Sequence, residues 1–293
     1  MQNKSKILGV DIGGTKIHMG EVSNGIVLRD LKFSTSASAP KEQILQEIVD
    51  GITQLMTPET LGIGIGVPGL VDEENGIVHN VQNIPSWEKV HLKEYLEDHF
   101  EKPVYITNDA NTFAAGEKMY GKGKNFRNFV GITLGTGIGT GIIINDTIYS
   151  GAFSGAGEFG GIPYLDKTIE DYSSGKFFKK FGTTGKKLML KADQGDANAL
   201  EIFNQYGNHL GSALKVILYS ISPEAIFLGG SVSQCYKYFQ ESLFASLKEF
   251  PYDVISDNLV VEKSFIASAS ILGSAALFLM RYEQDPSFKS YLK

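Results

Sequence analysis

The sequence predicts two similar α/β domains with a cleft between them, and a repeated glycine-rich hairpin is the main reason. Residues 11–16 read Asp-Ile-Gly-Gly-Thr-Lys, and an altered copy, Thr-Leu-Gly-Thr-Gly-Ile-Gly-Thr-Gly, occupies residues 133–141. An apolar run precedes and follows each copy, so each predicts a strand, a turn and a second strand. Backbone N–H groups in such a turn can converge on an anion, and glycine lets a phosphate approach closely. Two copies therefore favour the binding of one polyphosphate, such as a nucleotide, by both domains.

The first half of the chain predicts three strands and then alternating helices and strands. Asn24-Gly25 between two apolar runs is a strong hairpin signal. Pro40 begins a helical pattern with apolar residues on one face. The expected strands are 7–10, 17–22, 26–33, 61–67 and 104–107, and the expected helices are 40–56, 92–100 and one that follows 108–111 and runs to 120.

The second half of the chain repeats this order. We expect paired strands within 129–149, helices around 177–180 and over 197–221, a strand at 225–228, a helix, a strand at 259–262 and a helix over 270–280. The glycine- and lysine-rich stretch 121–125 has the composition of a boundary. The expected domains are therefore 1–121, which the C-terminal helix can complete, and 122–293.

Composition and charge exclude several classes of protein. The chain has 293 residues, of which 42% are apolar and 20% charged, and its formal net charge is −6. A negative net charge argues against a nucleic-acid partner, because phosphate backbones require clustered Lys and Arg. The single cysteine, Cys235, excludes an intramolecular disulfide and is expected to be a small packing residue. No stretch reads as a signal peptide, a membrane-surface helix or a membrane span, so we expect a soluble cytoplasmic protein.

Seven short motifs follow one another along the chain, and together they are more specific than any glycine loop alone. They are DIGGTK (11–16), GIGVPG (64–69), NIPSW (83–87), NDAN (108–111), LGTGIG (134–139), GAGEFG (155–160) and LGGS (228–231). In this order they resemble the ROK family of sugar kinases over nearly the whole chain.

The resemblance implies a fold and an activity. The fold is the two-domain actin-like, hexokinase-type (ribonuclease H-like) α/β fold with a cleft between the domains. The activity is ATP-dependent phosphorylation of a hexose, glucokinase-like, with ATP and Mg²⁺ required and a homodimer as the assembly. The winged helix-turn-helix of the family's repressors is not expected, because the first nucleotide hairpin begins at residue 7.

Asp109 is the candidate catalytic residue, because phosphoryl transfer to a sugar requires a carboxylate within reach of the attacking hydroxyl. The tetrapeptide Asn108–Asn111 alone favours a simpler interpretation, in which Asn108 or Asp109 caps a helix. The resemblance reverses that preference, since the matching aspartate is the family's general base. It also implies that Asn108, together with Asp109, binds the sugar.

The two hairpins supply the candidate nucleotide-binding residues. Asp11 either braces the first turn or holds a magnesium-bound water, since Mg²⁺ keeps several waters and uses few carboxylates. Lys16 either neutralises phosphate charge or is a solvated strand residue. The glycines of 229–231 either lie against the adenine or ribose or form an ordinary turn. The full candidate set is Asp11, Gly13, Gly14, Thr15, Lys16, Gly135, Thr136, Gly137, Gly229 and Gly230.

Three further residues are candidate sugar ligands. Glu158 is a carboxylate in a glycine-rich loop, where such a group has little structural use, and the matching family glutamate binds sugar hydroxyls. Asn83 resembles a sugar contact, whereas Trp87 is expected to be a packing residue. Glu170 matches a family glutamate across a short deletion.

That deletion is the main departure from the family. In most relatives a histidine follows the Gly-Glu-Phe-Gly motif and precedes a zinc-binding cysteine segment. Here Gly161 occupies the histidine position, and only eight residues separate it from Glu170, none of them cysteine. A zinc site requires about four N or S ligands, so we expect no zinc.

The missing histidine leaves the acceptor open. Glucose is the first candidate, and N-acetylmannosamine, N-acetylglucosamine, fructose and allose are the alternatives. A catalytically silent sugar sensor is a rival from another class, although a sensor has no need of Asp109, Asp11 and both hairpins. A kinase that uses polyphosphate as donor is a third alternative.

Overall fold

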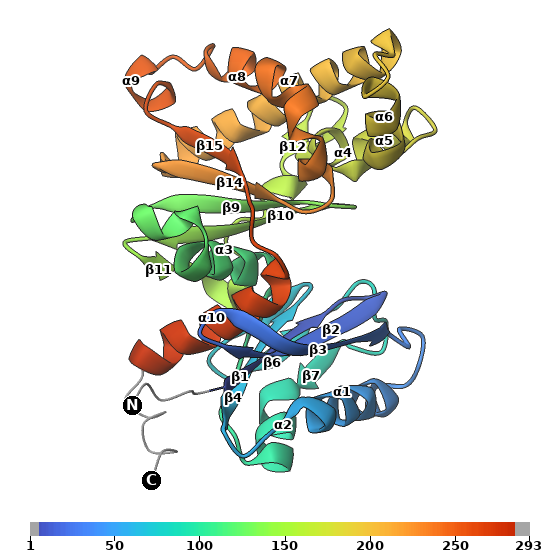
Figure 1. Ribbon diagram of the computed structural model, residues 1–293, viewed down its shortest axis with the longest axis vertical. Helices are drawn as coiled ribbons and strands as arrows, with labels where there is room; N and C mark the ends of the chain where they lie inside the picture. The colour runs from blue at the N-terminus through green and yellow to red at the C-terminus, as the bar shows by residue number, and fades with distance from the viewer. Residues whose placement is uncertain (1–5, 285–293) are drawn as a thin grey trace. The chain divides into compact units, whose positions relative to one another are not determined.

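The computed structural model describes residues 6–284 and divides the chain into two compact units (Figure 1). Unit 1 consists of the residues up to 124, residues 147–156 and the residues from 266 onward. Unit 2 consists of residues 125–146 and 157–265. The described part of the chain therefore enters unit 2 twice, and its last residues, 266–284, belong to unit 1. Each unit has its own hydrophobic core.

Unit 1 is built on a five-stranded sheet with the order β3-β2-β1-β4-β8. Strands β1, β2 and β3 are antiparallel neighbours, and β4 and β8 run parallel to β1. Asn24 and Gly25 have φ angles of 51° and 75°, which are those of the tight turn expected between β2 and β3. The strands are β1 (Lys6–Ile12), β2 (Lys16–Ser23), β3 (Ile26–Ser34), β4 (Thr60–Val67) and β8 (Val104–Asn108).

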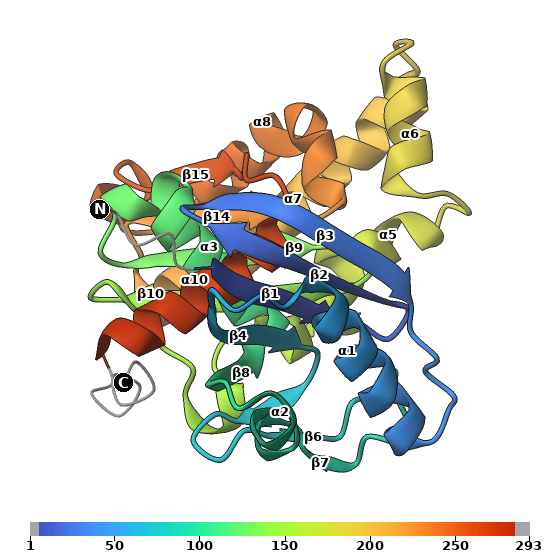
Figure 2. The ribbon, with the colours of Figure 1, turned by 60° about the horizontal axis from the view of Figure 1, so that its bottom comes forward.

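Helices cover both faces of this sheet (Figure 2). Helices α1 (Lys41–Leu55) and α2 (Leu92–Phe100) pack on one face, and α3 (Asp109–Tyr120) and α10 (Ala269–Gln284) pack on the other. Small residues in β1 and β4 allow α10 to approach the sheet backbone. A Cβ at Gly64 would lie 2.0 Å from the Ser274 carbonyl oxygen, so only glycine fits there.

A small antiparallel sheet, β5-β6-β7, is the part of unit 1 that the sequence did not predict. Its strands are β5 (Leu70–Asp72), β6 (Ile77–His79) and β7 (Lys89–His91), each only three residues long. The separate stretch of unit 1, residues 147–156, carries β11 (Thr147–Ile148), which lies within the paired strands expected over 129–149, and an unpredicted 3-10 turn, Ala152–Ser154. Runs this short have no periodicity that a sequence pattern could reveal.

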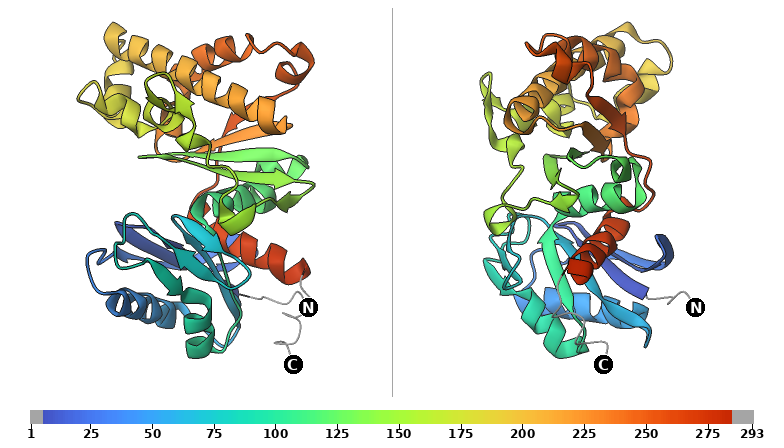
Figure 3. Two further views of the ribbon diagram at one scale, coloured as in Figure 1. Left: turned by 180° about the vertical axis from the view of Figure 1, so that it is seen from behind. Right: turned by 90° about the vertical axis from the view of Figure 1, so that its left-hand side faces the viewer.

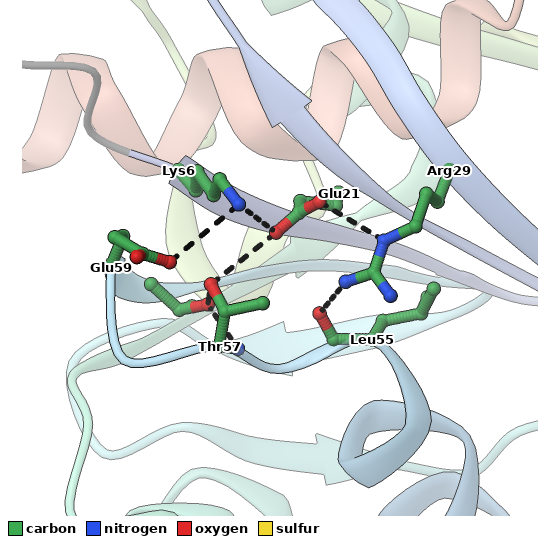
Figure 4. Close-up of polar contacts among 7 residues, drawn as sticks. Lys6, Glu21, Arg29, Leu55, Thr57 and Glu59 are labelled. Atoms are coloured by element: carbon green, nitrogen blue, oxygen red, sulfur yellow. Dashed lines mark hydrogen bonds and ion pairs between the residues drawn. The ribbon is translucent and has the colours of Figure 1, made fainter.

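Glu21, a buried residue of β2, is the centre of an ionic cluster that joins β1, β2 and β3 of unit 1 (Figure 4). The Glu21 carboxylate lies 3.1 Å from Lys6 Nζ and 3.2 Å from Arg29 Nε. Thr57 donates a hydrogen bond to the same carboxylate, and Arg29 also donates to the Leu55 carbonyl. Burial alone would raise the pKa of Glu21, but the hydrogen bonds from Arg29 and Lys6 outweigh burial and lower it.

Unit 2 repeats the strand arrangement of unit 1. Strand β9 pairs antiparallel with β10 and parallel with β14, and β14 pairs parallel with β15. Gly131 faces Gly141 across β9 and β10, as Gly9 faces Gly20 across β1 and β2. The duplicated hairpin predicted from the sequence is therefore confirmed. The strands are β9 (Phe129–Leu134), β10 (Ile138–Ile144), β14 (Ala225–Gly229) and β15 (Val260–Lys263).

Helices of unit 2 pack against its sheet around a core rich in aromatic residues (Figure 3). Cys235 lies in that core as expected, with 1% of its surface exposed. Within residues 6–284, no helix combines the length and the apolar character needed to cross a membrane. The helices are α4 (Ile169–Ser173), α5 (Gly175–Lys179), α6 (Gly185–Ala192), α7 (Ala197–Ile221), α8 (Tyr236–Leu247) and α9 (Asp253–Ser256).

Candidate functional site

The first hairpin turns between β1 and β2 and presents two free backbone donors. The Gly13 N–H donates to the Lys16 carbonyl at 2.9 Å, and Thr35 donates to the Gly13 carbonyl at 2.6 Å. Among residues 6–284, the N–H groups of Gly14 and Thr15 donate no hydrogen bond. Neighbouring N–H groups of this kind form an anion-binding concavity.

Asn83 lies directly against this hairpin. A Cβ at Gly14 would be 2.3 Å from the Asn83 Cβ and 3.2 Å from its carbonyl oxygen. The Asn83 side chain is exposed, whereas Trp87, four residues on, has only 1% of its surface exposed. Trp87 is therefore a packing residue, as predicted, and unit 1 itself brings a candidate sugar ligand next to a candidate phosphate-binding glycine.

Asp11 lies on β1 just before the hairpin, opposite His18 on β2. Burial raises the pKa of the Asp11 carboxyl, and a hydrogen bond from Ser270 and the positive charge of Lys16 oppose that increase. Lys16 itself is exposed. A nearby cation would compensate for the desolvation of the carboxylate, so the position suits an oxygen ligand or second-sphere partner of a hard metal ion.

The second hairpin turns between β9 and β10, and a different backbone hydrogen bond closes it. The Gly135 N–H donates to the Gly137 carbonyl at 2.9 Å, and the Gly175 N–H and Ser174 hydroxyl donate to carbonyls of the turn. In the described part of the chain, the N–H groups of Thr136 and Gly137 have no acceptor. Each unit therefore presents an adjacent pair of free backbone donors at its glycine turn.

Glu170 lies beside the second hairpin. Its carboxylate accepts a hydrogen bond from the Ile138 N–H at 3.0 Å and pairs with Lys176. A Cβ at Gly137 would lie 2.3 Å from Glu170 Oε2. The carboxylate thus contacts one side of the second glycine turn, a contact that the sequence did not predict. Its proposed contact with sugar is additional to this one.

Asn108 takes the capping role that the motif allowed for either Asn108 or Asp109. Asn108 is the N-cap of α3: its Oδ1 accepts from the Ala110 N–H at 2.8 Å, and its Nδ2 donates to the Gly69 carbonyl at 3.0 Å. Capping by Asn108 leaves Asp109 as the first residue of the helix, with its side chain exposed. The partial positive charge of a helix N-terminus favours the ionised form of such a carboxylate.

The short segment between Gly161 and Glu170 forms a two-stranded hairpin, β12 (Pro163–Tyr164) and β13 (Lys167–Thr168). It contacts α7 through Tyr164, whose hydroxyl oxygen lies 3.1 Å from His209 Nδ1. Beside it, Lys180 Nζ lies 3.3 Å from the centre of the Tyr172 ring in α4. Burial and the charge of Lys180 lower the pKa of His209. Residues 6–284 contain no group of three His, Cys, Asp or Glu side chains that could hold a metal ion.

Glu158 and Gly161 lie in the loop before this hairpin, and both are exposed. A Cβ at Gly161 would meet no atom within 4 Å. The glycine at this position is therefore not required by packing in unit 2.

The glycines after β14 lie against the second hairpin. Gly229 is the buried last residue of β14, and Gly230 has a φ of 81°. A Cβ at Gly230 would lie 2.4 Å from the Leu134 carbonyl oxygen, one residue before the turn. Backbone conformation and close approach together explain why glycine occurs at Gly230.

Comparison with known proteins places this geometry in context. A model of the ROK family matches residues 7–281. The glucokinase of Thermotoga maritima is 31% identical, and the match covers 95% of this chain and 98% of that protein. The xylose repressor of Bacillus subtilis is 29% identical over 93% of this chain and 76% of its own length.

A solved structure gives the same result for the fold. The structure of a ROK family glucokinase from Streptomyces griseus, in complex with glucose and AMPPNP, has a TM-score of 0.78 and 28% sequence identity. The match covers 93% of this chain and 99% of that one. The two-domain α/β fold class predicted from the sequence is thereby confirmed.

Proposed function

The chain belongs to the ROK family, and from this premise we propose that it is an ATP-dependent sugar kinase acting on a hexose, with glucose as the first candidate acceptor. The observation that carries the proposal is the pair of free N–H groups at each glycine turn, Gly14 with Thr15 and Thr136 with Gly137. A catalytically silent protein has no need of two phosphate-binding turns. The similarity to the Thermotoga maritima glucokinase supports the choice of glucose.

In the proposed reaction, Asp109 accepts the proton of the attacking sugar hydroxyl. The hydroxyl oxygen forms a bond to the γ-phosphorus, the bond from that phosphorus to the bridging oxygen breaks, and ADP leaves. Exposure at the first position of α3 supports this role, and the N-terminus of the helix favours a carboxylate there in its ionised form. Asn83, Asn108, Glu158 and Glu170 are the proposed sugar ligands.

The hairpins bind phosphate oxygens in this proposal through the backbone of Gly13–Lys16 and Gly135–Gly137. The hydroxyls of Thr15 and Thr136 and the charge of Lys16 add to the backbone donors. Gly229 and Gly230 are proposed to lie against the adenine or ribose. Asp11 suits Mg²⁺, since the ion uses one or two carboxylates together with substrate phosphates. When bound, Mg²⁺ neutralises charge on the phosphates.

The experiment that tests the function is ADP release from Mg-ATP against a panel of hexoses and N-acetylhexosamines. Strong turnover with one sugar would establish the kinase and name its acceptor; N-acetylmannosamine, N-acetylglucosamine, fructose and allose belong to the panel. Inorganic polyphosphate replaces ATP in a parallel series. No turnover with either donor, together with stabilisation by a sugar, would favour a sensor, which the similarity to the xylose repressor makes a relevant alternative.

Asp109→Asn tests the general base separately. We expect sugar binding close to that of the wild type and turnover reduced by about 10²-fold or more, because the amide cannot accept the proton. Near-normal turnover of this variant would contradict the assignment of Asp109. We further propose a homodimer, which light scattering on the purified chain would test.

A further inference from the structure

The carboxylate of Glu73 lies at the centre of a polar network that the proposed mechanism does not use. Glu73 lies in the turn between β5 and β6. It accepts hydrogen bonds from Tyr105 at 2.6 Å, from Ser154 at 2.7 Å and from the Thr107 hydroxyl. Burial and the adjacent carboxylate raise the pKa of Tyr105, which keeps the phenol protonated as a donor.

One part of the network, through Thr107 and Asn111, fixes residues on both sides of Asp109 in the sequence. Thr107 lies two residues before Asp109 at the end of β8, and its hydroxyl is bound to Glu73. Asn111 lies two residues after Asp109 in α3, and its Nδ2 donates to the Thr107 hydroxyl oxygen at 3.1 Å. Both side chains are buried, with 0% and 1% of their surfaces exposed. The exposed Asp109 thus lies between Thr107, which is bonded directly to Glu73, and Asn111, which is bonded to Thr107.

The other part of the network, through Ser154, fixes a segment of backbone in an unfavourable conformation. Phe153 and Ser154 both have a φ of 54°, a left-handed conformation that non-glycine residues rarely adopt. Such a conformation persists when surrounding contacts compensate for its cost. The Ser154 side chain is buried and donates to Glu73. From Ser154 the chain continues through three residues to Glu158, so Glu73 fixes the point from which that loop departs.

The turn that carries Glu73 is itself held by hydrogen bonds. Asp72 accepts hydrogen bonds from the Asn75 N–H at 3.1 Å and from the Asn75 side chain at 2.9 Å.

We propose that Glu73 is a positioning residue for the acceptor side of the kinase site. It orients the end of β8 that precedes Asp109 and the point at Ser154 where the loop to Glu158 begins. This inference rests on the proposed function.

The test compares Glu73→Ala with Glu74→Ala, a matched control in the same turn whose side chain is exposed. Glu73→Ala removes the shared acceptor, so we expect kcat/KM for the sugar to fall between about 10-fold and 100-fold, the range for small misplacement of reacting groups. The KM for ATP should change less than about twofold. Glu73→Gln retains one acceptor oxygen and should rescue part of the loss. The control should match the wild type.

Hydrogen exchange gives a readout that does not depend on activity. Amides of residues 107–110 and 151–154 should exchange faster in Glu73→Ala and at the wild-type rate in Glu74→Ala. Unchanged exchange, or equal losses for sugar and ATP, would overturn the proposal. If Glu73→Ala does not fold, Ser154→Ala removes only the hydrogen bond from Ser154 to Glu73 and should accelerate exchange only at 151–154. If the wild type turns over no sugar, the proposed function fails, while hydrogen exchange still decides whether Glu73 holds these segments.

Discussion

Replacing Gly14 with alanine tests whether the first hairpin packs directly against the segment that contains Asn83. A Cβ at Gly14 would lie 2.3 Å from the Asn83 Cβ, whereas ordinary contact begins near 3.4 Å. One of the two segments must therefore withdraw by about 1 Å to restore ordinary contact. The contact involves the Cβ and the carbonyl of Asn83 and not the end of a flexible side chain, so the movement includes the main chain.

The expected cost follows from overpacking, which destabilises by about 1–3 kcal/mol. At roughly 3 °C per kcal/mol for a unit of this size, the unfolding midpoint of Gly14→Ala should fall by about 3–9 °C. Displacement of Asn83 should also weaken the stabilisation that the acceptor sugar gives to the protein. Both effects arise from one added methyl group, because Gly14 is in contact with Asn83.

Differential scanning calorimetry with and without sugar measures both effects. Gly135→Ala, in the second hairpin, is the matched control, because its Cβ would meet nothing closer than the Gly137 carbonyl oxygen at 4.0 Å. Its midpoint without ligand should stay within about 1 °C of the wild type. An unchanged midpoint for Gly14→Ala, or equal losses in the two variants, would refute the packing argument.

Four further results are expected. Glu21→Gln should lower the free energy of unfolding by about 1–3 kcal/mol at pH 7. The difference from the wild type should shrink below about pH 4.5, because a carboxylate with a lowered pKa loses its stabilising effect as it is protonated. Urea titrations at pH 7 and pH 3.5 would check this. Gly161→His should fold with an unchanged midpoint, since its Cβ lies in open space, and steady-state assays should show a changed KM for the sugar and not for ATP. Gly137→Ala should displace the Glu170 carboxylate and raise the KM for ATP several-fold in the same assays. Elemental analysis of the purified chain should find far less than one equivalent of zinc, and chelation followed by excess Mg²⁺ should restore full activity; one equivalent would contradict the expectation.

The parts of the fold that the sequence predicts are those with a local signal. The two hairpins follow from glycines between apolar runs, and the turn at Asn24-Gly25 follows from a dipeptide that tolerates positive φ. The topology of unit 2 could be anticipated because it repeats that of unit 1. In each case the residues that determine the structure are within a few positions of one another.

The network around Glu73 had no such signal. Glu73 is 32 positions from Tyr105 and 81 positions from Ser154. A glutamate in a turn reads as a solvated residue in any sequence pattern, and only the folded chain brings its three donors together. The contact of Tyr164, in the segment between Gly161 and Glu170, depends in the same way on His209 of α7, which lies 45 positions later in the chain.

The two glycine turns share one more feature, which links the proposed donor and acceptor sites within each unit. In unit 1 the turn glycine Gly14 contacts Asn83, and in unit 2 the turn glycine Gly137 contacts Glu170. Both partners are proposed sugar ligands, and a Cβ on either glycine would lie 2.3 Å from an atom of its partner, which would have to move. A phosphate that shifts either turn must therefore also shift a sugar ligand. Binding of nucleotide and sugar should consequently be coupled, and the coupling should weaken when either glycine is replaced, because the partner residue is then already displaced.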